Sequence, residues 1–110
     1  MENDYQLLIS TCPNREIADK LAYLLVEQRL AAGVNIVPAI HSIYEWQGKI
    51  VSAAEVLLLI KTRREQYAAI QQTILQHHPY QVPELIAIPI VTGSPNYLAW
   101  IDSIVSQSYS

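Results

Sequence analysis

The sequence has little charge for its length. Only 15% of its 110 residues are charged, whereas 51% are hydrophobic, and average globular chains carry about 25% charged residues. A chain this short is expected to form a single domain, residues 1–110, which buries about 60–70% of its extended-chain surface. So much apolar surface on a small domain predicts that part of it is covered by another subunit.

A concentration of positive charge is also missing. The formal net charge is −3, and the longest basic run is Arg63–Arg64. A nucleic-acid interface is therefore not expected, since it needs a basic face, and binding to an anionic membrane surface is disfavoured for the same reason. No segment reaches the ~20 apolar residues of a membrane span.

The sequence also has little cysteine. Cys12 is the only one, which excludes an internal disulfide. It is either a reactive thiol whose pKa is lowered by a helix N-terminus or a buried thiol at a strand end, the favoured interpretation. Residues 1–4 are acidic and polar, unlike a signal peptide, so the sequence predicts a cytoplasmic protein.

Hydrophobic periodicity divides the chain into strands and helices. Asn14 is predicted to cap the first helix and Gly33 to follow its end, while residues 62–65 match a capping box before the second helix. Ser94 and Pro95 suit the start of the third helix. The expected strands are residues 5–12, 34–46, 49–62 and 85–91, and the expected helices run from 14 to about 30, from 62 to about 77, and from 95 onward.

The two middle strands form a long hairpin, residues 34–62, around a Gln47-Gly48 turn. Each strand could reach about 12 residues, roughly 40 Å at ~3.3 Å per residue, which is twice the usual strand length. The end of the hairpin must therefore project or meet another subunit. Pro38 places its first strand at a sheet edge or a bulge. Strict alternation puts one set of residues on the same face: Val34, Ile36, Pro38, Ile40, Ser42, Tyr44 and Trp46.

The order of elements is β-α-β-β-α-β with an additional C-terminal helix. This order predicts an α+β, ferredoxin-like sandwich. Right-handed crossovers put the strands at 5–12 and 49–62 in the centre of the sheet. The strands that carry Pro38 and Pro89 then become its edges, where proline is tolerated.

Two groups of polar residues are candidates for binding. His77, His78 and Glu84 include metal-ligand types, although adjacent histidines at a helix end can also cap it. Lys61 ends an apolar strand and can hold an anionic ligand or form a structural ion pair, within or between subunits, with Glu55 or Glu84; the ion pair is slightly favoured.

Aromatic side chains form a third group, made up of Tyr44, Trp46, Tyr80 and Trp100. Interface or core packing is favoured for them over a ligand cage. No nucleophile with a base and an orienting group stands out, nor does a glycine-rich phosphate loop. These features favour a binding protein over an enzyme.

Five segments resemble, in order and over nearly the whole chain, the motifs of the CutA divalent-cation tolerance proteins. They are RLAAGVNIVP (29–38), SIYEWQGKI (42–50), EVLLLIKT (55–62), HHPYQVPEL (77–85) and YLAWI (97–101). The resemblance implies a tight homotrimer like that of PII signalling proteins, with interlocking hairpins. It also implies a role in tolerance of divalent metals, copper especially.

The resemblance further implies clefts between subunits. The first hypothesis is that these clefts bind a divalent metal ion, such as copper, or a small anionic ligand, with Lys61 and the loop at 78–84 as the polar groups. The residues that match the family's cleft are Asn35, Tyr44, Trp46, Lys61, His78, Tyr80 and Glu84. His78 is the candidate metal ligand among them. Two alternatives stay open: an enzyme that uses His78 as acid–base and Lys61 as electrostatic stabiliser, and a stable trimeric scaffold for a protein partner.

Two positions depart from the family pattern. Many relatives carry cysteine at the position of Gly33, and some bacterial ones carry another at Ser10. Thiolates are the soft ligands that select Cu(I). The resemblance therefore implies that a thiolate copper site of that kind is not available to this chain.

Overall fold

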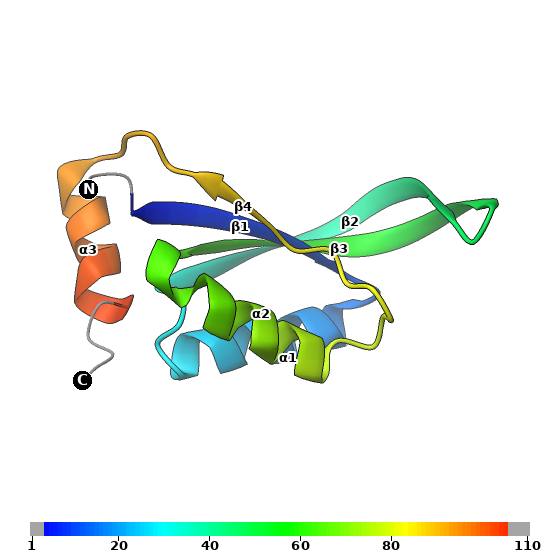
Figure 1. Cartoon of the computed structure of the whole chain (residues 1–110), viewed down its shortest axis with the longest axis horizontal. Coiled ribbons are helices and arrows are strands. Elements are labelled where there is room, and N and C mark those ends of the chain that lie inside the picture. The colour runs from blue at the N-terminus through cyan, green and yellow to red at the C-terminus, as the bar shows by residue number, and fades with distance from the viewer. Residues whose placement is uncertain (1–3, 106–110) are drawn as a thin grey trace.

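The computed structural model describes residues 4–105. Residues 1–3, on which the predicted location partly rests, and residues 106–110 lie outside the described part. Helices α1 and α2 cover one face of a four-stranded antiparallel sheet, and α3 lies at one end (Figure 1). The elements are β1 (Tyr5–Cys12), α1 (Arg15–Glu27), β2 (Gly33–Trp46), β3 (Lys49–Arg63), the 3-10 turn η1 (Arg64–Gln66), α2 (Tyr67–His77), β4 (Ile86–Pro89) and α3 (Pro95–Val105).

The strand order β2-β3-β1-β4 confirms the predicted α+β, ferredoxin-like arrangement. β3 and β1 are central, and the edge strands carry Pro38 and Pro89 as expected. No helix in the described part of the chain is long and apolar enough to cross a membrane.

The core lies between the sheet and helices α1 and α2. Leu8 of β1 pairs with Ile60 of β3, and both side chains are fully buried. Leu21 and Leu25 of α1 and Ile70 of α2 close the core from the helix side. This packing buries Val56, Leu58 and Ile60 of β3, and Glu55, the next residue toward the hairpin turn, lies where β3 leaves the core.

The first helix begins as predicted and ends earlier. Asn14 Oδ1 accepts a 2.9 Å hydrogen bond from the Ile17 N–H, but α1 stops at Glu27 and the chain reverses at Arg29, whose φ is +60°. Gly33 is not a cap; it starts β2. A side chain there would come within 3.3 Å of the Trp100 ring of α3, so glycine lets that ring pack closely.

The predicted capping box is wrong. β3 continues through Thr62, whose hydroxyl donates a 2.6 Å hydrogen bond to the Leu30 carbonyl instead of capping a helix. The turn η1 intervenes before α2, and Glu65 bonds to Arg63. The residue pattern is that of a cap, but the Leu30 carbonyl, in the connection between α1 and β2, takes the Thr62 side chain, and an ion pair with Arg63 takes that of Glu65.

A bulge at Pro38 and Ala39 divides β2 into two parts. The register passes from Val37 opposite Leu57 to Ile40 opposite Glu55, and Ala39 has a φ of +64°. One inserted residue turns every later side chain to the other face. The expectation that Val34 to Trp46 share one face is therefore wrong. The first residues face the helices, and Ile40, Ser42, Tyr44 and Trp46 face away from them.

Beyond the bulge, the β2–β3 hairpin leaves the sheet as a two-stranded arm, residues 40–55, because β1 reaches only Val56 on β3 (Figure 1). The arm contributes to a long axis of 43 Å, against 25 and 22 Å for the other two. Positive φ values at Gln47 and Gly48 confirm the predicted two-residue turn.

Candidate functional site

A hollow of about 780 Å³ opens where the arm leaves the sheet. Its walls come from the end of β1, from both strands of the arm, and from the loop between α2 and β4. The lining residues are Thr11, Ser42, Ile43, Tyr44, Trp46, Glu55, Pro79, Tyr80, Gln81, Val82 and Glu84. A space of this volume is within the usual size range of small-molecule sites.

Glu55 is the buried acid of this hollow. Its residue surface is 5% exposed, and its Oε2 accepts a 2.7 Å hydrogen bond from the Tyr80 hydroxyl. Burial, followed by the bond to Glu55, raises the pKa of Tyr80 well above its usual value. Tyr80 therefore keeps its proton at neutral pH and stays a donor to the carboxylate.

His78 lies behind the hollow and is buried. Its Nε2 is 2.7 Å from the Thr11 carbonyl oxygen, and the Tyr80 N–H donates to its Nδ1 at 3.1 Å. A carbonyl oxygen only accepts and an N–H only donates, so these partners fix the tautomer with the proton on Nε2. Metal coordination by His78 would have to displace one of them.

The loop at residues 78–84 is held against the end of β1. In addition to the His78–Thr11 bond, the Ser10 hydroxyl donates to the Glu84 carbonyl at 2.7 Å. The His78 and Tyr80 rings pack 4.9 Å apart. Ser10 thus has a structural role at the position where the resemblance points to cysteine in some relatives. His77, by contrast, caps α2 through the Thr73 carbonyl at 2.9 Å.

Asn35 and Lys61 do not line the hollow of their own chain. The Lys61 ammonium donates to Asn35 Oδ1 on the neighbouring strand. Lys61 is six residues from Glu55 along β3, which corresponds to roughly 20 Å of strand. The expected pairing of Lys61 with Glu55 therefore does not form within one chain, where Glu55 bonds to Tyr80 instead.

Of the seven residues expected in the cleft, the structure brings four together: Tyr44, Trp46, Tyr80 and Glu84. Sequence reasoning placed Glu55 beside Lys61 and missed its role in this hollow. The signal was present, because Glu55 is a lone acid before the apolar run Val56–Ile60. Trp100, on α3, packs over Gly33 and does not line the hollow.

Cys12 is fully buried beside the hollow. Burial, with a smaller effect of Glu55, raises the pKa of its thiol to about 11. This confirms a buried strand-end thiol and leaves little reactive thiolate at neutral pH. Across residues 4–105, no three His, Cys, Asp or Glu side chains gather closely enough to hold a metal ion.

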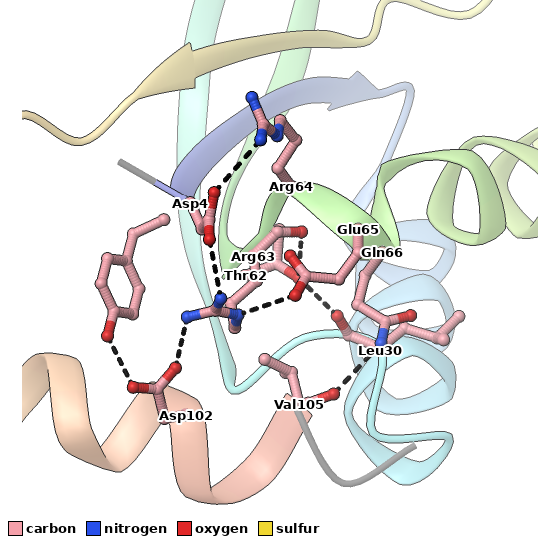
Figure 2. A network of polar contacts seen from close by, with 10 residues as sticks. Asp4, Leu30, Thr62, Arg63, Arg64, Glu65, Gln66, Asp102 and Val105 are labelled. Atoms are coloured by element: carbon pink, nitrogen blue, oxygen red, sulfur yellow. Dashed lines mark hydrogen bonds and ion pairs between the residues drawn. The ribbon is translucent and has the colours of Figure 1, made fainter. Parts of the chain in front are cut away.

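A second polar cluster, here called the Arg63 network, ties α3 to the sheet (Figure 2). The Arg63 guanidinium contacts Asp102 of α3, Asp4 at 3.1 Å and Glu65 at 3.2 Å. Arg64 reaches the other oxygen of Asp4 at 3.3 Å. The Tyr5 hydroxyl donates to Asp102 at 2.6 Å, and this bond raises the pKa of Tyr5. Sequence reasoning missed this cluster, because its members come from distant parts of the chain.

Residues 6–104 match the sequence profile of a family described as "CutA1 divalent ion tolerance protein". The chain is 48% identical over 97 residues to "Protein CutA homolog" of Xenopus laevis, covering 88% of this chain and 64% of that protein. It is 50% identical over 91 residues to "Protein CutA, chloroplastic" of Arabidopsis thaliana, covering 83% and 50%. The chain thus spans about half to two thirds of these relatives.

The fold is similar to that of solved structures as well. The structure called "Divalent cation tolerance protein (Cut A1)", from Thermus thermophilus, superposes with a TM-score of 0.90 at 42% identity. That superposition covers 92% of this chain and 98% of the Thermus chain. The similarity therefore includes the arm and the loop that form the hollow, as well as the core.

Proposed function

Because the chain belongs to the family of CutA1 divalent ion tolerance proteins, we propose that it acts in divalent-cation tolerance as a homotrimer. Its subunit clefts bind a divalent metal ion such as copper, or a small ligand. The observation that carries this proposal is the acidic hollow beside a projecting apolar arm. The proposed location is the cytoplasm; the Arabidopsis relative is named as chloroplastic.

The arm supports assembly because each of its two faces exposes large apolar side chains. Ile43 and Ile50 are 68% and 75% exposed on one face, and Tyr44 and Trp46 are each 40% exposed on the other. Exposed apolar surface of this extent marks interfaces. A free two-stranded arm is also a risk for aggregation. Packing of the arm against neighbouring copies would bury this apolar surface and cover the free strand edges.

The same packing makes the hollow a cleft between subunits. The hollow lies at the base of the arm, so a neighbour that packs on the arm also closes the hollow. Asn35 and Lys61 lie elsewhere in their own chain, and in this proposal they reach the cleft from a neighbouring copy. The cleft would then combine groups from two subunits.

Binding has more support than catalysis. Both ring nitrogens of His78 are engaged with Thr11 and Tyr80, which leaves His78 poorly placed as an acid–base group. Lys61 and His78 also lie apart within one chain. The enzyme and the protein scaffold are therefore the weaker alternatives.

The molar mass of the protein in solution tests the proposed trimer. We expect multi-angle light scattering at micromolar concentration to give three times the chain mass of 12.4 kDa. The reason is that the arm alone exposes four large apolar side chains per subunit. A monomeric mass at this concentration would contradict the proposal.

Metal binding is tested by titration calorimetry with Cu²⁺ and Zn²⁺ on the assembled protein. We expect wild type to bind Cu²⁺, and His78→Ala to bind it at least about tenfold more weakly if His78 is a ligand, a loss of about 1.4 kcal/mol. His77→Ala is the matched control, because it removes the adjacent imidazole that caps α2. Equal binding by wild type and His78→Ala would remove His78 from the site.

A further inference from the structure

We infer that the hollow binds a small organic cation that carries an ammonium group, anchored by Glu55. This inference rests on the proposed function, since it names the ligand class of the same cleft. It also differs from the small anionic ligand hypothesised from the sequence. Its basis is the charge, burial and aromatic surface of the lining residues.

The charge of the lining favours a cation. Glu55 and Glu84 are its two acidic residues, and it includes no Lys, Arg or His. Near a protein surface, opposite charges within about 4 Å attract each other, and like charges repel each other to the same extent. An anion in this hollow would therefore meet two carboxylates with no counter-charge from its own chain.

Glu55 has the geometry of an anchor. It is 5% exposed, and Tyr80 holds its Oε2 in place. Among the described residues, Gln6 carries the one buried side-chain oxygen that lacks a partner. No described side chain donates to the Oε1 of Glu55, and this atom is not fully buried, so it keeps some accessible surface in a residue that lines the hollow. A nearly buried carboxylate is costly without a cation, and a bound ammonium would supply one.

Aromatic rings form much of the remaining wall. Tyr44 and Trp46 of the arm face the same side as Glu55, and Tyr80 bonds to it from the loop. The faces of aromatic rings attract cations, and tryptophan attracts them most strongly. Carbon-bearing cations also bury apolar surface against such rings, which a hydrated metal ion does not.

Size and donor set separate an organic cation from a metal ion. The hollow has a volume of about 780 Å³, far larger than a metal ion. Divalent ions take four or more ligands, whereas no three metal-binding side chains gather in residues 4–105. A buried glutamate with a second glutamate in the same lining and aromatic neighbours suits an ammonium group.

The competing cation is the Lys61 ammonium of a neighbouring copy. In this structure Lys61 donates to Asn35 on the adjacent strand, at the far end of β3 from the hollow. This bond gives the lysine a partner within its own chain. In the proposed trimer this lysine and an external cation are the two alternatives for Glu55, and the Lys61→Ala variant distinguishes them.

The test is titration calorimetry of the assembled protein with choline and with inorganic phosphate at constant ionic strength. We expect choline to bind and phosphate not to bind. Glu55→Gln should weaken choline binding at least tenfold, because it keeps an acceptor for Tyr80 and removes the charge. Trp46→Leu should weaken it about threefold to tenfold. Glu16→Gln, which removes one exposed charge on α1, should leave it unchanged.

Three outcomes would overturn the inference: no choline binding, choline binding that Glu55→Gln and Trp46→Leu both leave unchanged, or phosphate binding in its place. Choline binding that emerges only in Lys61→Ala would also overturn it and would identify the neighbour's lysine as the occupant. A trimer that binds Cu²⁺ but not choline overturns the inference alone. A monomeric protein overturns the proposed function.

Discussion

Replacing Arg63 by alanine is expected to lower the free energy of unfolding by about 2–3 kcal/mol. The Arg63 side chain is 14% exposed and meets Asp4, Glu65 and Asp102 (Figure 2). Removing one partner of a buried ion pair costs about 3–5 kcal/mol, because the other charge stays behind. The three carboxylates are 27–54% exposed, so water compensates part of that loss.

The effect should be concentrated at α3. Apolar contacts of Ile101 and Val105 hold this helix, and the bond between Arg63 and Asp102 links it to the end of β3. Hydrogen exchange should therefore show faster exchange in α3 of Arg63→Ala than in α1. Arg63→Lys should restore only part of the stability, since an ammonium cannot reproduce the contacts of three guanidinium nitrogens.

Arg15→Ala is the matched control, measured by urea unfolding at the same protein concentration. Arg15 pairs with Asp19 on the surface of α1, where the two side chains are 63% and 46% exposed. Exposed pairs contribute about 0–1 kcal/mol. Equal urea midpoints for Arg63→Ala and Arg15→Ala would show that the Arg63 network does not stabilise the fold.

The order of the elements and the sheet was predictable, because it depends on local patterns. Asn14 caps α1, and Pro95 opens α3 at its first turn. Pro38 and Pro89 mark edge strands. These signals are carried by residues close in sequence, and the crossover rule then leaves one arrangement of strands.

What was not predictable depends on contacts between distant residues. Pro38 predicted an edge or a bulge, and both are present. The positive φ of Ala39, which fixes where the bulge lies and which face Tyr44 and Trp46 occupy, could not be predicted from an alanine. Thr62 and Glu65 match a capping pattern, but Leu30 and Arg63 take their side chains. Local propensity is a weak prior where tertiary partners compete.

The candidate site also contains residues that could be predicted from the sequence and one, Glu55, that could not. The family resemblance named Tyr44, Trp46, Tyr80 and Glu84, which the fold gathers around one hollow. Glu55 joins them only because the bulge and the loop at residues 78–84 bring three segments together. Its partner Tyr80 is 25 residues away, a distance at which spacing in the sequence carries no information about contact.

Ile43→Glu is expected to dissolve the proposed trimer into folded monomers. Ile43 is 68% exposed in the single chain and lies on the arm, beyond the sheet. Burying an unpaired carboxylate in an apolar interface costs several kcal/mol, and about 4 kcal/mol corresponds to a roughly thousandfold weaker association. The fold itself should persist, because Ile43 contributes nothing to the core cluster between the sheet and the helices.

Light scattering and circular dichroism on the same samples distinguish dissociation from unfolding. Tyr23→Glu is the matched control, since Tyr23 is 70% exposed on α1 and lies away from the arm. It should keep the trimeric mass. If Tyr23→Glu dissociates the protein and Ile43→Glu does not, subunits associate through the helices. The hollow beside the arm is then open to solvent and needs no neighbour to form. If Ile43→Glu alone dissociates it, the subunits associate through the arm, which is the face that the two exposed isoleucines Ile43 and Ile50 share.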